Sequence, residues 1–348
     1  TKKPQLGSVR NVTESIIPYL KKGDTVILRS TVPVGTSRNV VMRLIEAGTG
    51  LEAGTDFYFG FVPERTIEGK ALYEQKNIPQ IVGALNEESG RKISGIFSEF
   101  NEKLIYVPEM EHAELCKIID NTYRDVTFAY ANQMAMICER LGLDFHTIRQ
   151  ACNNGYQRND VPAPSPGVGG ACLTKDPYIL IDLCQKLSID TQLIKVAREI
   201  NEAVVPNLAE KVFSRLTALG KSIYSSKIFI MGFAFKGEPE TSDMRFSTTL
   251  DLVEYLKPFC AGLYGYDGIV SDEEIASTGV TSCSIQEGFK HADVVVIMNT
   301  HHSHKDLDIR ELSNKSSKPL ILVDCWNLYD KSEVQAGGDI IYSSIGLY

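Results

Sequence analysis

The hydrophobic pattern changes its period twice along the chain, and this change constrains the fold more than any other feature of the sequence. From residue 24 to residue 97, apolar runs of strand length alternate with amphipathic helical segments. Helical periodicity then dominates from residue 111 to residue 219, and strand-length runs return from residue 227 onward. Alternation of strands and helices is typical of α/β architecture. We therefore predict two doubly wound parallel sheets joined by a helical centre.

The same pattern predicts the individual elements. Strands are expected at 24–28, 57–61, 80–83, 228–233, 263–266, 293–299 and 320–324. Helices are expected at 12–20, 37–47, 87–97, 111–141, 145–152, 178–219, 247–256 and 284–290. Within the last long helical segment we expect a break at Pro206, because proline removes a helical hydrogen bond.

Composition and charge exclude several classes of protein. The 27 Gly, 14 Pro, 43% hydrophobic and 23% charged residues are those of a folded globular protein. The net charge of −8 argues against a nucleic-acid partner, and no apolar run approaches the roughly 20 residues that cross a bilayer. The eight cysteines are scattered singly, which fits a cytoplasmic protein without a metal site. The first residues lack a starting Met and a secretory signal, so we expect the chain to begin in mid-protein.

A segment rich in Gly and Pro, residues 153–177, contains the cysteine with the strongest chemical signal. Thr174 is expected to be a helix N-cap and Pro177 to lie in the first turn, which places Cys172 just ahead of a helix N-terminus. The helix N-terminus and the charge of Lys175 both favour the nucleophilic thiolate. The alternative is a small buried cysteine without chemistry, the interpretation that we adopt for the other seven.

Two polar residues on the long expected helix can stabilise a developing negative charge. Lys117 and Asn121 are four residues apart and therefore project from one helix face. A cation beside an amide donor can hold an oxyanion. Considered alone, the pair is better explained as a solvated lysine and an asparagine of no special function.

Three loops follow expected strands, at the sheet edge where α/β proteins bind ligands. The first two are residues 30–35 and 63–69, whose polar groups can line a cofactor cleft or simply form solvated turns. The third is residues 232–237, which leads through Arg245 into a helix. There Lys236 and the helix N-terminus can contact a diphosphate.

Taken in order, these segments resemble the UDP-glucose/GDP-mannose dehydrogenase family of nucleotide-sugar 6-dehydrogenases. The motifs that carry the resemblance are STVPVGT, PER…EG, ELxKxxxN, GVGGACLTKD and GFAFKG…DMR, and they extend over nearly the whole chain. The resemblance implies two Rossmann-like domains joined by a helical central domain. It assigns 1–107 to the second half of an NAD-binding Rossmann domain, 108–218 to the central domain with the cysteine loop and the dimer interface, and 219–348 to a domain that binds the UDP-sugar.

Two features depart from the family pattern. The Gly-rich dinucleotide fingerprint that opens the N-terminal domain is absent, so that domain is incomplete in this chain, and whether the chain binds NAD alone stays open. In addition, no Lys lies between Arg158 and Cys172, where many UDP-glucose enzymes have one that contacts the substrate.

The resemblance also implies a mechanism and a set of roles. Two NAD oxidise the sugar C6 in two steps, through a thiohemiacetal and then a thioester on the cysteine, and water releases the uronate. The implied catalytic residues are Cys172, Lys117, Asn121, Asp176, Thr31 and Glu64. The implied NAD contacts are Ser30, Thr31, Glu68, Lys175 and Arg245. The implied substrate contacts are Glu64, Lys117, Asn121, Arg158, Gly167, Phe235 and Lys236.

The resemblance does not identify the sugar of the substrate. Two other functions are alternatives to the family activity. Arg65 stands where UDP-glucose enzymes usually have Phe, which favours a UDP-N-acetylhexosamine over UDP-glucose. One rival function is a one-step hydroxyacid dehydrogenase, which needs no cysteine and makes one NADH per product. The other is a non-catalytic nucleotide-sugar binding protein. The resemblance further implies a cytoplasmic homodimer that supplies a uronic acid for polysaccharide biosynthesis.

Overall fold

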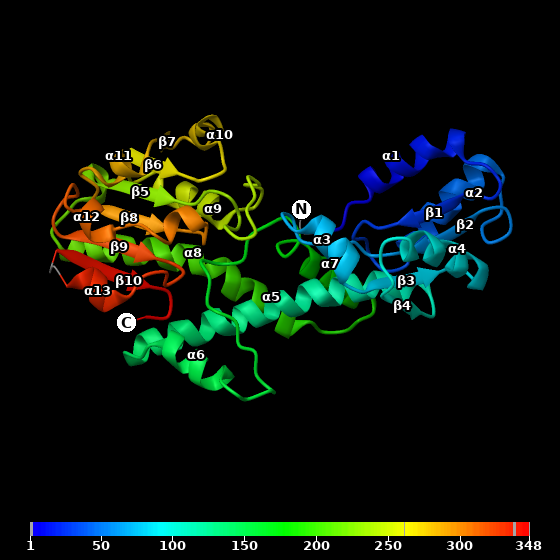
Figure 1. The fold of residues 1–348 in the computed structure, drawn as a ribbon, viewed down its shortest axis with the longest axis horizontal. Helices are drawn as coiled ribbons and strands as arrows, with labels where there is room; N and C mark the ends of the chain where they lie inside the picture. The colour runs from blue at the N-terminus through cyan, green and yellow to red at the C-terminus, as the bar shows by residue number, and fades with distance from the viewer. Residues whose placement is uncertain (1–2, 261, 337–338, 348) are drawn as a thin grey trace. The chain divides into compact units, whose positions relative to one another are not determined.

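The structure is a computed structural model that describes residues 3–260, 262–336 and 339–347 (Figure 1). It divides into two compact units. The first comprises Thr1–Tyr123 and Lys175–Ile194, and the second comprises Arg124–Thr174 and Lys195–Tyr348. Each unit has its own sheet and its own hydrophobic core.

The first unit contains a four-stranded sheet in the order β1-β2-β3-β4. Its strands are β1 (Thr25–Leu28), β2 (Tyr58–Phe61), β3 (Gln80–Ala84) and β4 (Leu104–Val107). Its helices are α1 (Gly7–Ile16), η1 (Ile17–Tyr19), η2 (Ser37–Met42), α2 (Arg43–Thr49), α3 (Ala71–Asn77) and α4 (Glu87–Ser98). Phe59 and Phe61 pack in one core cluster, whereas Val82 and Ile93 belong to a second. The sheet is therefore packed on both faces, as an α/β fold requires.

The structure confirms the α/β class and corrects details of this unit. The β2–β3 pair is antiparallel, whereas β1–β2 and β3–β4 are parallel as expected. The helix expected at 37–47 consists of a π-helical turn, η2, followed by α2. Strand β4 and helix α3 are elements that the hydrophobic pattern did not predict.

Two long helices contribute residues to both units. Helix α5 (Met110–Leu141) matches the expected helix almost residue for residue, and α6 (Phe145–Asn153) follows it. The segment expected as one helix with a break at Pro206 is instead α7 (Asp176–Lys186) and α8 (Gln192–Ala218), and α8 continues through Pro206. The break lies at 187–191, where Ser188 has a φ of 57°, which cannot continue a right-handed helix. Because α5 and α8 both cross between the units, the three-domain division stays a prediction.

The second unit contains a six-stranded parallel sheet in the order β10-β9-β8-β5-β6-β7. Its strands are β5 (Lys227–Met231), β6 (Gly262–Tyr266), β7 (Thr281–Ser282), β8 (Val294–Ile297), β9 (Leu320–Asp324) and β10 (Ile340–Ser344). Counted from β5, this is the 3-2-1-4-5-6 order of a Rossmann fold. The chain reverses its winding direction between β5 and β8, so a ligand crevice is expected at their carboxyl ends. Strands β7 and β10 were not predicted from the sequence.

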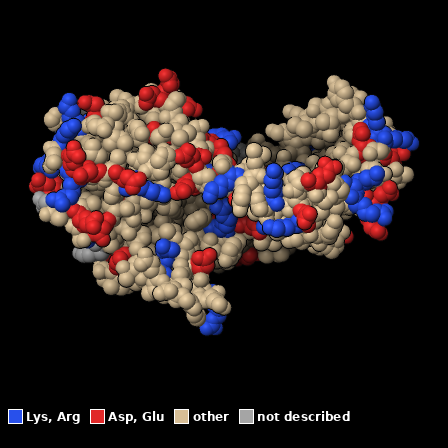
Figure 2. Space-filling model, viewed as in Figure 1, with Lys and Arg blue, Asp and Glu red and all other residues tan. Residues whose placement is uncertain are grey.

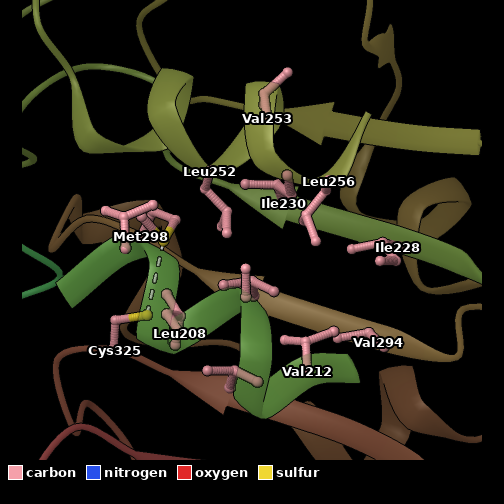
Figure 3. Close-up of a cluster of buried hydrophobic side chains, with 14 of the residues drawn as sticks. Leu208, Val212, Ile228, Ile230, Leu252, Val253, Leu256, Val294, Met298 and Cys325 are labelled. Atoms are coloured by element: carbon pink, nitrogen blue, oxygen red, sulfur yellow. Dashed lines mark hydrogen bonds between the residues drawn. The ribbon is translucent and has the colours of Figure 1, made fainter. Parts of the chain in front are cut away.

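The central strands of this sheet are buried on both faces. Alternate residues of β5 and β8, such as Ile230 and Val294, pack with Leu208 of α8 and with α9 (Thr248–Leu256), as Figure 3 shows. The intervening residues, such as Phe229, belong to a separate cluster with Phe289. Burial on both sides explains why these strands are continuous apolar runs without alternation.

Polar residues define the starts of helices in the second unit. The side chains of Ser247, Ser271, Ser284, Asp308 and Asp330 each accept a backbone N–H of the following turn. The helices after α9 are α10 (Asp272–Ser277), α11 (Ile285–Phe289), η4 (His302–His304), α12 (Ile309–Ser313) and α13 (Lys331–Gln335). A cap of this kind contributes about 1 kcal/mol. The starts of these helices are therefore determined by residues next to them in the sequence.

Two observations concern the surface charges and the helices of the described residues. Acidic and basic side chains are interspersed on the visible face of each unit (Figure 2). Among the described residues, no helix has both the length and the apolar composition needed to cross a bilayer.

We expect the core of the second unit to be sensitive to Ile230→Ala. Ile230 is fully buried, so the substitution removes apolar contacts and leaves a cavity, at a cost of about 2–5 kcal/mol. The only Trp in the sequence, Trp326, packs against the same cluster, so its fluorescence during urea unfolding reports on this unit. Ile269→Ala is the matched control, because Ile269 is 42% exposed and should lose far less. Equal losses for the two variants would contradict this description of the core.

Candidate active site

One face of α5 carries a row of buried polar side chains. Glu114, Asn121, Asp125 and Asn132 are all buried, and their spacings of seven, four and seven residues place them along one side of the helix. Each of them hydrogen-bonds to a segment outside the helix. Buried polar groups need such partners, so this row fixes the loops that it contacts.

Glu114 holds the loop that follows β1. Its carboxylate accepts the backbone N–H of Gly35 at 2.5 Å and the N–H and hydroxyl of Ser37 at 2.8 and 2.6 Å. Burial raises the pKa of Glu114, while these hydrogen bonds oppose the rise. In the same loop, Ser30 is exposed and Thr31 is half-buried, directly after the carboxyl end of β1. This matches the expected position of both residues at a ligand-binding edge.

Glu64 and Arg65 follow β2 and have different partners. The Glu64 carboxylate forms an ion pair with Arg29 at 3.0 Å and accepts hydrogen bonds from the Thr66 N–H and the Gln75 amide. Burial alone would raise the pKa of Glu64, but these contacts outweigh it and lower the pKa. Arg65 instead forms an ion pair of 3.0 Å with Asp120 on α5. Glu68, farther along the loop, is exposed.

The structure brings Asn121 and Asp176 into direct contact. The Asn121 amide donates to Asp176 Oδ2 at 2.5 Å, and both side chains are buried. The other Asp176 oxygen pairs with the half-exposed Lys175. Lys117 is partly buried one helical turn before Asn121. In the first unit, the fold thus gathers four of the sequence-predicted site residues at the start of α7.

Cys172 belongs to the second unit and is exposed. Helix α7 starts at Asp176 with Pro177 in its first turn, so the cysteine does precede a helix. The expectation that Thr174 caps this helix is wrong, because its hydroxyl donates back to the carbonyl of Gly170 at 2.8 Å. The N-cap position is occupied by Lys175, whose side chain pairs with the Asp176 carboxylate and does not cap the helix backbone. Thr174 therefore stabilises the turn around Cys172.

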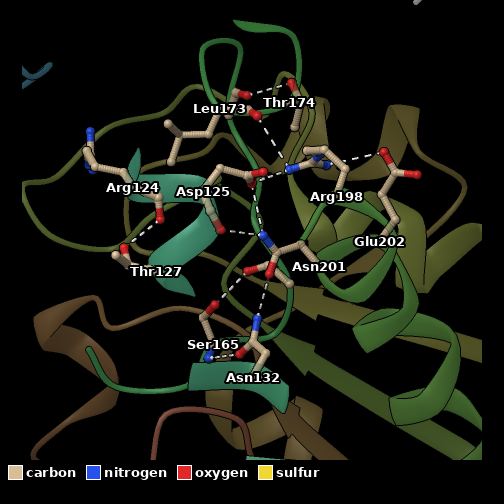
Figure 4. A network of polar contacts seen from close by, with 12 residues as sticks. Arg124, Asp125, Thr127, Asn132, Ser165, Leu173, Thr174, Arg198, Asn201 and Glu202 are labelled. Atoms are coloured by element: carbon tan, nitrogen blue, oxygen red, sulfur yellow. Dashed lines mark hydrogen bonds and ion pairs between the residues drawn. The ribbon is translucent and has the colours of Figure 1, made fainter. Parts of the chain in front are cut away.

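A buried ion pair lies beside the cysteine loop (Figure 4). Arg198 of α8 donates to Asp125 of α5 at 2.6 Å and to the carbonyl of Leu173, the residue after Cys172, at 3.4 Å. Arg198 also pairs with Glu202 at 3.3 Å. Burial leaves the pKa of Asp125 above its usual value despite the Arg198 charge. One guanidinium therefore links α5, α8 and the backbone next to the cysteine.

The glycine-rich part of the loop is fixed by a second set of contacts in Figure 4. Asn132 accepts the N–H of Ser165 at 2.8 Å and donates to Asn201 at 3.0 Å. The Ser165 hydroxyl donates to the carbonyl of the buried Gly167 at 2.8 Å. Gly170, with a φ of 86°, lies so close to Phe235 that a Cβ would be 2.8 Å from the ring. The expected substrate residues Gly167 and Phe235 are therefore in one packed region.

The third loop leaves β5 at the point where the sheet changes its winding direction. Gly232, with a φ of 95°, ends the strand earlier than predicted. Asp267, after β6, accepts the N–H groups of Phe233 and Ala234 at 2.6 and 3.1 Å and so fixes the start of the loop. The Lys236 ammonium lies 5.5 Å from the centre of the Phe235 ring.

Two expected ligand contacts are exposed arginines. Arg245 forms a bidentate pair with Asp243, with contacts of 2.6 to 3.0 Å, and this pair lowers the pKa of Asp243. Arg158 stacks on Tyr156, with its guanidinium carbon 4.6 Å from the ring centre. Both cations are accessible to an anionic ligand.

Sequence reasoning missed the residues that hold the loops. Asp125, Asn132, Arg198 and Asn201 carry no catalytic motif, and the available signal was the recurrence of polar residues at helical spacing in apolar helices. The prediction that the other seven cysteines are buried is wrong for Cys152, which is exposed.

Comparison with known proteins gives a consistent result. Models of three domains of the UDP-glucose/GDP-mannose dehydrogenase family match the chain: the NAD binding domain at residues 1–101, the central domain at 111–203 and the UDP binding domain at 229–331.

Individual relatives cover most of the chain. A UDP-N-acetyl-D-mannosamine dehydrogenase of Pyrococcus horikoshii is 29% identical over 95% of this chain and 75% of its own length. An NDP-N-acetyl-D-galactosaminuronic acid dehydrogenase of Ralstonia solanacearum is 27% identical over 90% of this chain and 74% of its own. The solved structure of a UDP-D-ManNAc dehydrogenase from Pyrococcus horikoshii superposes with a TM-score of 0.89 over 99% of this chain and 78% of that one, at 28% identity. The chain thus belongs to the UDP-glucose/GDP-mannose dehydrogenase family and is an NAD-dependent oxidoreductase of the nucleotide-sugar dehydrogenase type.

Proposed function

We propose that the chain oxidises the C6 hydroxymethyl group of a UDP-N-acetylhexosamine to the carboxylate, with Cys172 as the nucleophile. The observation that carries this proposal is an exposed cysteine in a loop whose backbone is held before the cysteine by the buried Asn132 and after it by the buried Arg198. A reactive thiol needs access to its substrate and a fixed position. The two relatives named for N-acetylated sugars support the choice of substrate class.

The proposed reaction uses the residues of this chain in separate steps. The C6 alcohol loses a hydride and a proton to give the aldehyde, and the Cys172 thiolate adds to its carbonyl carbon to form a thiohemiacetal. Loss of a second hydride leaves a thioester, which water hydrolyses to the carboxylate and the free thiol. NAD, when bound, accepts the hydride in each oxidation.

The polar residues of the first unit suit charge stabilisation and water positioning. The Asn121 amide and the Lys117 ammonium are donors for the oxyanions, and the fixed Asp176 carboxylate orients Asn121. Thr31 and Glu64 would position the attacking water. Because Arg29 and the neighbouring donors lower the pKa of Glu64, its carboxylate is a hydrogen-bond acceptor near neutral pH.

The cofactor and the nucleotide have separate proposed contacts. Accessible hydroxyls at the carboxyl end of β1 and an exposed carboxylate on the next loop fit the polar groups of a dinucleotide, so we assign Ser30, Thr31 and Glu68 to NAD. Lys175 and Arg245 are the cations assigned to it. Phe235, Lys236, Gly167 and Arg158 are assigned to the UDP-sugar.

We also propose a cytoplasmic homodimer whose product enters polysaccharide biosynthesis. Exposed apolar residues recur on one face of α5 at Tyr130, Ile137 and Leu141, with spacings of seven and four residues. An apolar stripe of this kind is typical of a helix that packs against another chain. A dimer interface along α5 would cover it.

Cys172→Ser tests the nucleophile. The serine hydroxyl is far too weakly acidic to ionise near neutral pH, so net turnover should fall by at least a thousandfold, while nucleotide-sugar binding should survive. The full-length protein is assayed for NADH against a panel of nucleotide sugars, with Cys152→Ser as the matched exposed-cysteine control. Wild-type protein should make two NADH per uronate. One NADH per product, or near wild-type turnover by Cys172→Ser, would refute the proposed mechanism.

Arg198→Lys tests whether the buried ion pair positions the cysteine loop. Lysine keeps the charge but lacks the planar guanidinium whose Nη1 contacts Asp125 and the Leu173 carbonyl while its Nη2 contacts Glu202, so kcat should fall about tenfold or more with little change in KM. Glu202→Gln is the control, because it alters the exposed partner of the same arginine and should stay within about twofold. Circular dichroism checks that both variants are folded. A folded Arg198→Lys protein with wild-type kcat would contradict the positioning role.

Ile137→Glu tests the dimer. A buried glutamate at a symmetric apolar interface is left unpaired, so the variant should be monomeric at micromolar concentration when the wild type is dimeric. Ile96→Glu, on an exposed site of α4, should leave the mass unchanged. Light scattering after size exclusion measures the mass. A monomeric wild type would refute the proposed dimer.

A further inference from the structure

Three potential metal ligands meet at the carboxyl edge of the second sheet. Glu240 lies in the loop that follows β5, and His301 and His302 follow β8. One ligand atom from each residue lies within 4.8 Å of the others. Glu240 Oε1 is 3.3 Å from His301 Nε2 and 2.7 Å from His302 Nδ1. Glu240 is distant in the sequence from the adjacent His301 and His302, which explains why the sequence analysis predicted no metal site.

His301 is held rigidly in this cluster. Its side chain is only 4% exposed, its backbone N–H donates to Asn299 at 3.2 Å, and its Nδ1 lies 2.8 Å from the Ser303 hydroxyl. A Cβ on Gly268 would be 2.3 Å from the ring, so the imidazole fills the space that this glycine leaves. The ring therefore has little freedom to turn away from Glu240.

The other nitrogen of His301 has an unsatisfied bonding position. Among the described residues, His301 Nε2 is buried without a hydrogen-bond partner, although it faces Glu240 Oε1 at 3.3 Å. A buried polar atom without a partner costs about 1–3 kcal/mol. His301 Nδ1 also accepts the backbone N–H of Ser303 at 3.2 Å, so metal binding at Nε2 requires the ring proton to move to Nδ1, where the Ser303 hydroxyl at 2.8 Å can accept it. Nε2 then presents a lone pair toward Glu240 and His302.

The donor set matches a transition-metal ion. Two imidazole nitrogens and one carboxylate form a three-residue zinc site that leaves a fourth position for water. Ligands about 2.0–2.1 Å from one tetrahedral ion lie roughly 3.3 Å apart, which is the separation between His301 and Glu240, whereas His302 lies closer to Glu240, at 2.7 Å, and has to move outward to bind the same ion. His302 and Glu240 are 71% and 49% exposed, so an ion can reach them and their side chains can adjust.

The other titratable groups near His301 leave room for a cation. His304 lies 5.8 Å from His301 between ring centres, and its Nδ1 lies 3.4 Å from the carbonyl of Asn299. Lys305 is paired with Glu238 at 2.8 Å. The Lys305 charge is therefore compensated by a carboxylate outside the cluster.

We propose that Glu240, His301 and His302 bind a divalent transition-metal ion of the Zn²⁺ type. The ion would join the loop after β5, which carries Phe235 and Lys236, to the segment after β8. It would thus fix two loops at the point where the sheet changes its winding direction. This role is structural and does not depend on the proposed dehydrogenase reaction.

Titration of the metal-free full-length protein with Zn²⁺ and with Co²⁺ tests the proposal. Calorimetry should give one ion per chain, and the visible Co²⁺ spectrum should be that of a tetrahedral site with nitrogen and oxygen ligands. His302→Ala and Glu240→Gln change exposed side chains and should fold normally, but each should weaken binding more than tenfold. Binding should also weaken as the pH falls through the histidine range, because protonated imidazole cannot bind a metal.

Controls separate this site from incidental binding. His112→Ala and Glu273→Gln alter exposed residues of the same types elsewhere and should bind as the wild type does. The titration is repeated with Cys152→Ser and Cys172→Ser together, which removes the exposed thiols as ligands. Absence of binding by this double variant, or equal binding by His302→Ala and wild type, would overturn the proposal. Because neither NAD nor a sugar is present, failure of the proposed enzymatic function would leave this result unchanged.

Discussion

The buried pair of Asp125 and Arg198 is the interaction on which the cysteine loop of the second unit depends. The two side chains come from different helices, and the guanidinium also contacts the carbonyl beside Cys172. Transferring two charges from water to the protein interior costs free energy. A buried ion pair recovers this free energy only with good geometry and additional hydrogen bonds. Asn201 supplies one of these, since its amide donates to Asp125 at 2.9 Å. The pair therefore contributes a defined position for the loop more than it contributes stability.

Helix α5 carries buried polar side chains that fix loops in both units. In the first unit, Glu114 fixes the loop after β1 and Asn121 fixes the start of α7. In the second unit, Asn132 holds Ser165 in the glycine-rich loop, and Asp125 holds the Arg198 that contacts the Leu173 carbonyl. Because consecutive buried residues on one helix keep a constant spacing, a single rigid element sets the position of each loop within its unit.

The topology of the second sheet determines where its polar residues lie. Its central strands are packed on both faces by apolar side chains, so polar residues occur only where the strands end. Asp267 fixes the loop after β5 through two backbone N–H groups, and Asn299 stands at the equivalent end of β8. The chain winds in opposite directions from β5 and from β8. No helical connection therefore covers the space between the carboxyl ends of these two strands. Lys236 and the cluster of Glu240, His301 and His302 all follow these ends.

The sequence by itself determined the elements whose signal is local. Helix α5 and the buried strands β5, β8 and β9 appear where periodicity predicted them, because a hydrophobic period reflects which face of one element is buried. The cysteine loop and the Lys117–Asn121 pair were identified as candidate site residues from the chemistry of their motifs and from the family resemblance. The edge strands β7, with two residues, and β10, with five, were missed, since a strand at a sheet edge needs no strong pattern of its own.

Only the tertiary structure decided which polar groups become partners. The contacts between Asn121 and Asp176, between Arg198 and Leu173, and between Glu240 and His301 join residues that are distant in sequence. A side chain's sequence neighbours do not report its burial, and burial is what makes an unpaired charge or nitrogen costly. Likewise, α8 continues through Pro206, while the chain breaks at Ser188 without a proline or glycine. At Pro206 packing outweighed local propensity, because a helix with an extensively buried face gains more from its contacts than one lost backbone hydrogen bond costs.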